Sequence, residues 1–412
     1  MAQLNITLNQ DEILQLMQSD REGAFVKLLQ ESLNSVMKAE STEQLHAESY
    51  ERNDDRAGYR NGSRERVLNT RIGSFTLRVP KHREGVPFKT AVFDTFCRSE
   101  AALVASMAEM VVNGVSTRKV NDVVETLCGT SISKSAVSDL CRDLDKAVNE
   151  FRNRPLTDSY PFVTVDATYF KVREDHRVIS KALMIAYATN SKGIRDIIGF
   201  GAYPNESKDT WTDFLTGLRG RGLRDVRMFI SDSHEGIKYA IAHIFPDTPW
   251  QRCQFHFTRN IIDKMPKKYQ QGIASELREM FSCDTVENAR MMRDSIISEY
   301  SDIAESAMSC LEEGFEDSMT VMALPKDIRK YFRTSNHIER LNHELKRRSK
   351  VIGIFPNVDS LERLMGSVLM ERNDKIQNAK RVFYTPVYQK VEASVDRLRL
   401  KAREQQQLLL AS

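Results

Sequence analysis

The sequence lacks the features of a membrane-embedded or secreted protein. It contains no run of about 18 apolar residues, which excludes a membrane-spanning helix. Residues 1–20 carry acids and glutamines in place of a basic start followed by an apolar stretch, so no secretory signal is visible. Six cysteines among 412 residues fit reduced thiols and argue against a disulfide framework. We therefore expect a cytoplasmic protein with no membrane partner.

An excess of charge of one sign is also missing, because the net charge is only +3. The charge is unevenly distributed, however. Residues 56–90 hold nine lysines and arginines against two glutamates, and residues 340–350 hold five against one, which leaves the rest of the chain acidic. Contacts to a nucleic-acid backbone require such basic segments. Two solvated basic faces would give the same pattern, so charge alone does not decide between these interpretations.

The N-terminal third predicts three regions. Residues 1–55 are expected to be helical, with apolar residues on one face for packing or a dimer contact. Residues 56–98 change to turn and alternating patterns, which predict a basic β-ribbon or arm. Residues 99–154 predict three short helices, the outline of a helix-turn-helix DNA-binding domain. An ordinary pair of packed helices remains the alternative.

From residue 155 the pattern becomes α/β. Strands are predicted at Phe162–Phe170, Val178–Thr189, Ile194–Ala202, Val226–Asp232 and Trp250–Phe255, with helices around Trp211 and over His234–His243. Three strands, helix, strand, helix and strand are the element order of a ribonuclease H-like core, here expected at 155–256 and 333–390. Residues 257–332 predict an all-α insertion, and residues 391–412 a polar tail.

Three acidic residues are candidates for metal chemistry. Asp166 interrupts an apolar strand, where a carboxylate is costly unless it is paired, metal-bound or at the edge of the sheet. Asp232 ends the fourth predicted strand, and ligands of open α/β sheets gather beyond strand carboxyl ends. Glu339 lies near the start of a helix predicted after Thr334, which Ile338, Leu341 and Leu345 would dock on the core. A cap, a turn or a solvated ion pair is the simpler interpretation of each acid alone.

Further residues are candidates for DNA contacts or structural roles. Short polar and basic side chains at the start of the third helix of residues 99–154 suit phosphates or base edges. The candidate DNA-binding residues are Arg60, Arg64, Arg66, Lys134, Ser135, Arg340, Lys346, Arg347 and Arg348. Cys253 and His256 form half of a zinc site, for which no second pair is evident, so packing is at least as good an interpretation. Trp211 is a core residue or a base-stacking platform.

The segments around these residues resemble the Mutator-type transposases of bacterial insertion sequences. The resemblance extends over about residues 55–375 and is carried by the motifs Val165-Asp166-Ala167, Ser231–Gly236, Gln251–Phe257, Thr334–Asn342, Lys346-Arg347-Arg348 and Val351–Asn357. It implies a DDE transposase on a ribonuclease H-like fold, with Asp166, Asp232 and Glu339 as its catalytic, metal-binding triad. It also implies binding to terminal inverted repeats and a homodimer that holds two transposon ends near the bacterial nucleoid.

The resemblance further implies a metal-dependent polynucleotidyl transferase. Two Mg²⁺ (or Mn²⁺) ions between the three carboxylates would support cleavage of double-stranded DNA at the transposon end and then strand transfer into target DNA. Two other classes stay open from the sequence. A structure-selective nuclease would share the fold and metals without joining DNA, and a non-catalytic DNA-binding regulator would not require three acids on separate elements.

Overall fold

The computed structural model describes residues 21–51, 55–70, 73–85, 87–90, 92, 107–108, 110–111, 117–128, 134–350 and 352–411. The chain divides into two compact units, residues 1–143 and 144–412. The sequence predicted the boundary at Pro155, but it falls inside helix α5 (Lys134–Asn153). The end of α5 belongs to the second unit because Asp145 pairs with Arg363 at 2.7 Å and Arg152 with Glu362 at 2.6 Å.

The first unit contains a helix packed against a two-stranded ribbon. Helix α2 (Arg21–Leu45) precedes the antiparallel strands β1 (Gly58–Thr70) and β2 (Gly73–Gly85). The shared core consists of Met37, Leu68, Leu77 and Val79, with Leu29, Leu33, Phe88 and Val92 at its edge. Leu68, Leu77 and Val79 share one face of the ribbon because side chains alternate along a strand, and this face packs on α2. Within the helical region predicted at residues 1–55, the structure describes one helix, α2, which ends at Leu45.

Helix α4 (Thr117–Cys128) and the first part of α5 form a separate small core. Val120, Val124 and Leu140 share it with Met107. The period of about 3.6 in the sequence brings these apolar side chains onto facing sides of the two helices. The turn that a helix-turn-helix requires, at residues 129–133, lies outside the described residues.

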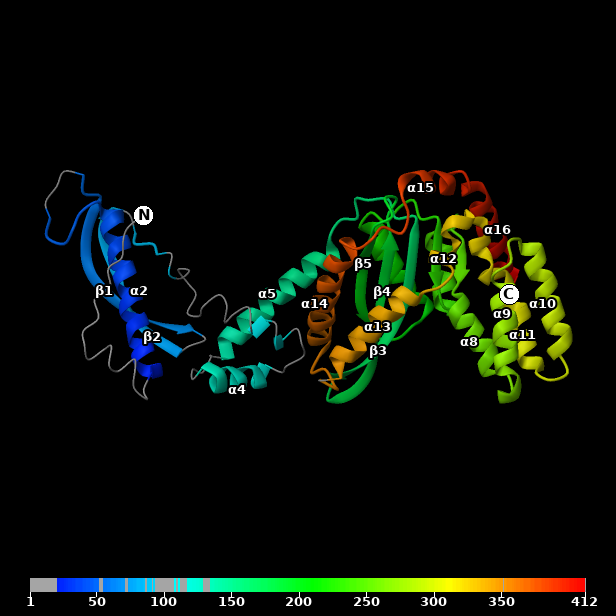
Figure 1. The fold of residues 1–412 in the computed structure, drawn as a ribbon, viewed down its shortest axis with the longest axis horizontal. Coiled ribbons are helices and arrows are strands. Elements are labelled where there is room, and N and C mark those ends of the chain that lie inside the picture. Colours follow the sequence, from blue (N-terminus) through cyan, green and yellow to red (C-terminus); the bar gives the residue numbers. More distant parts are fainter. Residues whose placement is uncertain are drawn as a thin grey trace. The chain divides into compact units, whose positions relative to one another are not determined.

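The second unit is built around a mixed sheet of five strands (Figure 1). Its strands are β3 (Phe162–Glu174), β4 (Arg177–Thr189), β5 (Arg195–Tyr203), β6 (Met228–Ser231) and β7 (Trp250–Arg252). The order across the sheet is β5-β4-β3-β6-β7, with antiparallel β3–β4–β5 and with β6 and β7 parallel to β3. Helices α6 (Lys208–Gly220) and α7 (Glu235–Ile244) connect the parallel strands.

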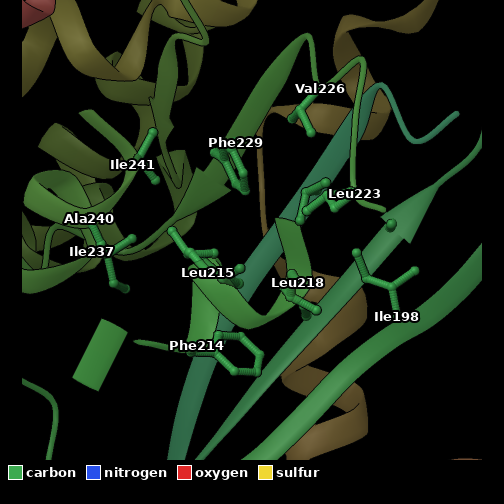
Figure 2. Close-up of a cluster of buried hydrophobic side chains, with 14 of the residues drawn as sticks. Ile198, Phe214, Leu215, Leu218, Leu223, Val226, Phe229, Ile237, Ala240 and Ile241 are labelled. Atoms are coloured by element: carbon green, nitrogen blue, oxygen red, sulfur yellow. The ribbon is translucent and has the colours of Figure 1, made fainter. Parts of the chain in front are cut away.

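Alternating side chains of β3 divide between the two faces of the sheet. Val163 and Val165 face the apolar cluster that α6 and α7 complete, which Figure 2 shows around Phe214, Leu215 and Phe229. Phe162 faces the opposite side, where it stacks on Phe332 with ring centroids 3.8 Å apart. Because side chains alternate along a strand, Thr164 and Asp166 share this second face with Phe162. The acid therefore lies outside the main apolar layer.

Helices make up the remainder of the second unit. Helices α8 (Gln254–Asp263), α9 (Gln270–Met280), α10 (Val286–Tyr300) and α11 (Glu305–Ser318) enclose a core of their own. They are followed by α12 (Lys326–Phe332), α13 (Asn336–Ser349), α14 (Val358–Gln377), α15 (Thr385–Glu392) and α16 (Val395–Ala411), with short 3₁₀ turns at Lys267–Tyr269 and Thr320–Ala323. In the part of the chain that the structure describes, no helix combines the length and apolarity needed to cross a bilayer.

The predicted strand at Trp250–Phe255 is wrong beyond Arg252. Cys253 stands at the N-terminal boundary of α8, and Gln254 is already helical. The backbone N–H of Cys253 still donates to Ser231 O at 2.7 Å, as a strand residue would, but the N–H of Gln254 turns away to Arg333 O at 2.9 Å. The strand ends there because its next hydrogen-bond partner comes from a distant loop, which local pattern does not reveal.

Candidate active site

The register of β3 and β6 brings two of the predicted acids together. Each β3 residue pairs with the β6 residue 66 positions later, from Phe162 and Met228 to Thr164 and Ile230. Asp232 follows Asp166 by the same 66 positions, one residue after β6 ends, so the pairing leads toward both acids. The charge of Asp232 raises the pKa of Asp166, which shows that the two carboxylates lie near each other, as ligands of a shared cation would.

The environment of Asp166 disfavours its ionised form. Burial raises the pKa of Asp166 to about 7, and the charge of Asp232 adds to the shift, while a hydrogen bond from the N–H of Ala167 opposes it. That N–H donates to Asp166 Oδ1 at 2.9 Å, and Asn342 Nδ2 donates to Oδ2 at 2.7 Å. Both oxygens are therefore oriented, and a cation beside them would relieve the repulsion between the two acids.

Helix α13 carries the third predicted acid and packs on the same face of the sheet (Figure 1). Ile338, Leu341 and Leu345 are buried, as the apolar stripe in the sequence predicted. His337 Nε2 lies 3.0 Å from Thr164 Oγ1, and burial lowers the pKa of His337 to about 3, so its ring is neutral at physiological pH. The helix is thus fixed to β3 by an apolar stripe and by two polar contacts, from His337 and from Asn342.

Glu339 points toward a cluster of polar side chains at the end of β7. Its Oε1 accepts a hydrogen bond from Ser335 Oγ at 3.1 Å and lies 3.6 Å from His256 Nε2. The Cys253 sulfur next to the imidazole, together with the charges of Glu339 and Asp166, raises the pKa of His256 to about 9 against the effect of burial. Ser335, the residue before α13, makes no side-chain capping bond, and its hydroxyl bonds to Glu339 instead.

Two sets of donors lie at this end of the sheet. Asp166 and Asp232 offer hard oxygen ligands of the kind that Mg²⁺ prefers, so this pair fits a magnesium ion in its donor chemistry. Within the described ranges, the set of three side chains whose ligating atoms meet within 4.8 Å is instead Cys253, His256 and Glu339. The three predicted acids do not form such a set in this structure, because Glu339 turns toward Ser335 and His256.

The four predicted DNA-binding residues of α13 separate into two kinds. Arg340 and Lys346 are exposed, and Arg347 is exposed while it pairs with Glu344 at 2.8 Å. Arg348 differs, because only 11% of its side chain is exposed and it bonds to Glu344 at 3.1 Å and to Glu371 at 3.5 Å. Its guanidinium joins α13 to α14 and is not presented to solvent. For Arg348 the structure therefore favours a structural role over the predicted phosphate contact.

Glu344 is the centre of this ion-pair network, because it pairs with Arg347, Arg348 and Arg372. Hydrogen bonds from Arg347, and then from Arg372 and Arg348, hold the pKa of Glu344 well below its usual range. We expect Glu344→Gln to lower the free energy of unfolding at pH 7 by about 1.5–3 kcal/mol, the contribution of hydrogen bonds to a charged group. Because the folded pKa is depressed, this stabilisation is complete above the unfolded pKa of about 4.3 and is lost as the pH falls toward the folded value.

Urea denaturation of both proteins at several pH values measures this difference. Glu235→Gln is the matched control, since 69% of the Glu235 side chain is exposed and its pair with Lys238 is a surface pair. Such pairs contribute about 0–1 kcal/mol. An equal loss of stability in Glu344→Gln and Glu235→Gln would contradict the proposed stabilisation by the ion pairs of Glu344. A loss in Glu344→Gln that persists at low pH would contradict it as well.

The remaining sequence candidates lie in the first unit or in the core. Arg60 bonds to Thr42 Oγ1 at 2.8 Å and to Ala47 O at 2.9 Å, so it secures the end of α2. Arg64 is exposed and Arg66 is half-buried on β1. Lys134 and Ser135 begin α5, but their side chains lie outside the described residues. Trp211, a residue of α6, is fully buried in the core that α6 and α7 share with the sheet, which favours the core interpretation over a base-stacking platform.

Glu206 is a member of the site that the sequence did not reveal. It lies just before α6, and burial raises its pKa, an effect that His234 opposes and Asp232 enhances. Neither strand periodicity nor a motif marks this residue, because it belongs to a loop. Its proximity to Asp232 arises only in the folded chain, where the loop before α6 comes near the residue that follows β6.

Comparison with known proteins identifies the family. Residues 1–379 match the family described as "Transposase, Mutator family". The chain belongs to the Mutator family of transposases. The match covers the sheet, α13 and all of α14, so the acids described above lie within the part shared with this family.

Several relatives of this Mutator-family chain are transposases of insertion sequences. The transposase for insertion sequence element IS256 in transposon Tn4001 of Staphylococcus aureus is 41% identical over 379 residues, which are 91% of this chain and 97% of that protein. The transposase for ISRM5 of Rhizobium meliloti is 38% identical over 85% of this chain and 87% of its own length. The transposase for IS1081 of Mycobacterium tuberculosis is 34% identical over 92% and 91%.

Proposed function

We propose that this Mutator-family protein cleaves double-stranded DNA at the terminal inverted repeats of an insertion sequence and joins the ends to target DNA. The observation that supports the proposal is the pairing of β3 with β6, which leads toward Asp166 and Asp232, together with the effect of the Asp232 charge on Asp166. Glu339 stands on α13, which packs against the same face of the sheet. Three acids on separate elements at one end of a sheet offer the hard oxygen ligands that a catalytic metal site uses.

The fold that we propose for this unit is ribonuclease H-like. An antiparallel meander β3–β4–β5, followed by β6 and β7 parallel to β3, supports it. Helices α8 to α11 have their own apolar core, which supports an all-α insertion between Asp232 and Glu339. An insertion with a separate core lets 106 residues intervene between two acids of one site without disturbing the sheet.

Asp166, Asp232 and Glu339 are the residues proposed to hold Mg²⁺ or Mn²⁺, with two ions at each site. When bound, such ions activate a hydroxyl nucleophile and stabilise the leaving oxygen at phosphorus. The protein's own contribution is positioning. Asn342 and the Ala167 N–H orient the two oxygens of Asp166, and the Ser335 hydroxyl orients Glu339.

Binding of the transposon ends is proposed for the first unit. Arg64 is exposed on the ribbon of β1 and β2, and α4 and α5 pack as two helices of a helix-turn-helix would. Backbone contacts from such basic elements position the protein, and a recognition helix reads base edges. A homodimer that holds two ends is part of the same proposal.

A cleavage and joining assay on end duplexes tests the function. The wild-type protein is expected to cut the end in a Mg²⁺-dependent reaction and to join the resulting 3′-hydroxyl to target DNA, whereas Glu339→Gln does neither. Cleavage without joining would favour a structure-selective nuclease. Cleavage by Glu339→Gln at the wild-type rate would remove Glu339 from the site.

The salt dependence of end binding distinguishes the two kinds of basic residue on α13. We expect Lys346→Gln to weaken duplex binding and to lower the slope of log K against log salt concentration by about 1, as loss of one phosphate contact does. Arg348→Gln removes the same charge from the same helix but from a buried pair, so its slope should stay unchanged. Titrations at four or more salt concentrations provide the slopes. Equal changes in both variants would mean that only the net charge matters.

A further inference from the structure

Cys253 lies at a junction that joins the elements carrying two of the acids. Its backbone N–H donates to Ser231 O at 2.7 Å, and Ser231 immediately precedes Asp232. Its side chain is fully buried, and its sulfur lies 3.3 Å from Ser335 N and 3.2 Å from Ser335 Oγ. One residue thus contacts both the end of β6 and the first residue before α13.

Ser335 continues this connection to the third acid. Its hydroxyl lies between the Cys253 sulfur at 3.2 Å and Glu339 Oε1 at 3.1 Å. Ser335 is itself only 1% exposed, so water does not compete for these bonds. The next link, from Gln254 N–H to Arg333 O, fixes the loop that leads into α13. The start of α13 is therefore held to the end of the sheet by side chain and backbone together.

The same residues offer a second interpretation, a zinc site. Cys253, His256 and Glu339 are ligand types for zinc, and His256 Nδ1 is buried without a hydrogen-bond partner. Three observations argue against this interpretation. The sulfur already contacts the N–H and the hydroxyl of Ser335, and the same hydroxyl contacts Glu339 Oε1. Structural zinc sites have four protein ligands, and the described residues supply three here. A zinc ion would also occupy the carboxylate that the proposed function assigns to catalysis.

We propose that Cys253 is a positioning residue, which acts through Ser335 to hold Glu339 in place relative to Asp232 and does not ligate zinc. The role of Glu339 in this inference rests on the proposed function. Hydrogen-bonding partners of metal ligands orient those ligands, and their loss typically lowers metal affinity or activity about 10- to 100-fold. The contacts themselves, which we call the Cys253–Ser335 tether, are testable without any catalytic assay.

Four variants of the full chain test the tether. Cys253→Ala removes the sulfur, Cys253→Ser keeps a hydrogen-bonding atom, and Ser335→Ala removes the bridging hydroxyl. Cys283→Ala is the matched control, since the Cys283 thiol is half-buried and lies between Glu279 O and Met292 Sδ, outside this junction. Two measurements do not depend on catalysis. Elemental analysis should find no stoichiometric zinc, and the stability losses of Cys253→Ala and Ser335→Ala should be clearly less than additive in the double variant.

The third measurement is the rate of end cleavage across a range of Mg²⁺ concentrations. Cys253→Ala and Ser335→Ala should each lower the rate about 10- to 100-fold and raise the Mg²⁺ concentration for half-maximal rate, with duplex affinity unchanged. Cys253→Ser should recover most of the activity, and Cys283→Ala should retain the wild-type rate. If Cys253 and Ser335 had a purely structural role, the two alanine variants would lower the free energy of unfolding but would leave the Mg²⁺ requirement unchanged.

Three results would overturn the inference. The first is a zinc content of about one ion per chain in the wild-type protein that is lost in Cys253→Ala. The second is additive stability losses for Cys253→Ala and Ser335→Ala, and the third is an unchanged Mg²⁺ requirement in both variants. If the wild-type protein cleaves no end duplex, the proposed function fails, while zinc content and the double-variant comparison still decide whether the tether exists.

Discussion

Asp166→Asn is expected to lower the rates of DNA cleavage and joining by about 10³-fold or more. A carboxylate that binds a catalytic metal contributes several kcal/mol to transition-state stabilisation, and each 1.36 kcal/mol is a factor of ten in rate. Asparagine keeps the shape of the side chain but lacks the charge that holds a divalent cation. Rates of nicking and joining on an end duplex measure the effect.

Folding and duplex binding should survive this substitution. One of the two hydrogen bonds to Asp166, from Ala167 N or Asn342 Nδ2, is lost when an amide replaces an oxygen. That loss is partly offset, because the substitution also removes a buried charge from beside Asp232. Asp396→Asn, at a fully exposed side chain on α16, is the control and should leave the rates unchanged. An active Asp166→Asn protein would refute the assignment, and so would a variant that loses duplex binding in proportion to its activity.

Gly193→Ala is expected to lower the free energy of unfolding by about 3–4 kcal/mol, more than Glu344→Gln does. Gly193 has a φ of +76°, and an added Cβ would lie 2.1 Å from Phe383 O. The clash is with backbone, which cannot rotate away, and Val382 N–H also bonds to Gly193 O at 2.9 Å. The β4–β5 turn and the segment before α15 would have to separate, which disturbs the cluster around Phe162 and Phe383.

Gly353→Ala is the control that isolates the backbone clash. Gly353 has a similar φ of +73°, but nothing lies within 4 Å of an added Cβ. A left-handed backbone conformation alone disfavours alanine by about 1–2 kcal/mol. Equilibrium denaturation in urea gives both values. Equal losses in the two variants would show that the contact with Phe383 is not tight in solution.

Much of the second unit was predictable because its signals are local. The β-branched and aromatic residues around Asp166 define a strand whatever packs on it, and the apolar stripe through Ile338 and Leu341 defines a docking helix. The sequence also predicted the order of strands and helices and the all-helical stretch after Phe257. The end of β7 was mispredicted, since its last hydrogen bonds depend on Ser231 and Arg333, which are far away in the chain.

By itself the sequence determined where the strands and helices lie along the chain, which helix faces are apolar, and which acids interrupt or end apolar strands, because these properties depend on neighbours a few positions away. Only the tertiary structure decided that Asp166 lies near Asp232, that Arg348 is enclosed between Glu344 and Glu371, and that Cys253 reaches Glu339 through Ser335. Strand register and side-chain partners between distant segments are set by the packing of the whole unit, which no short stretch of sequence contains.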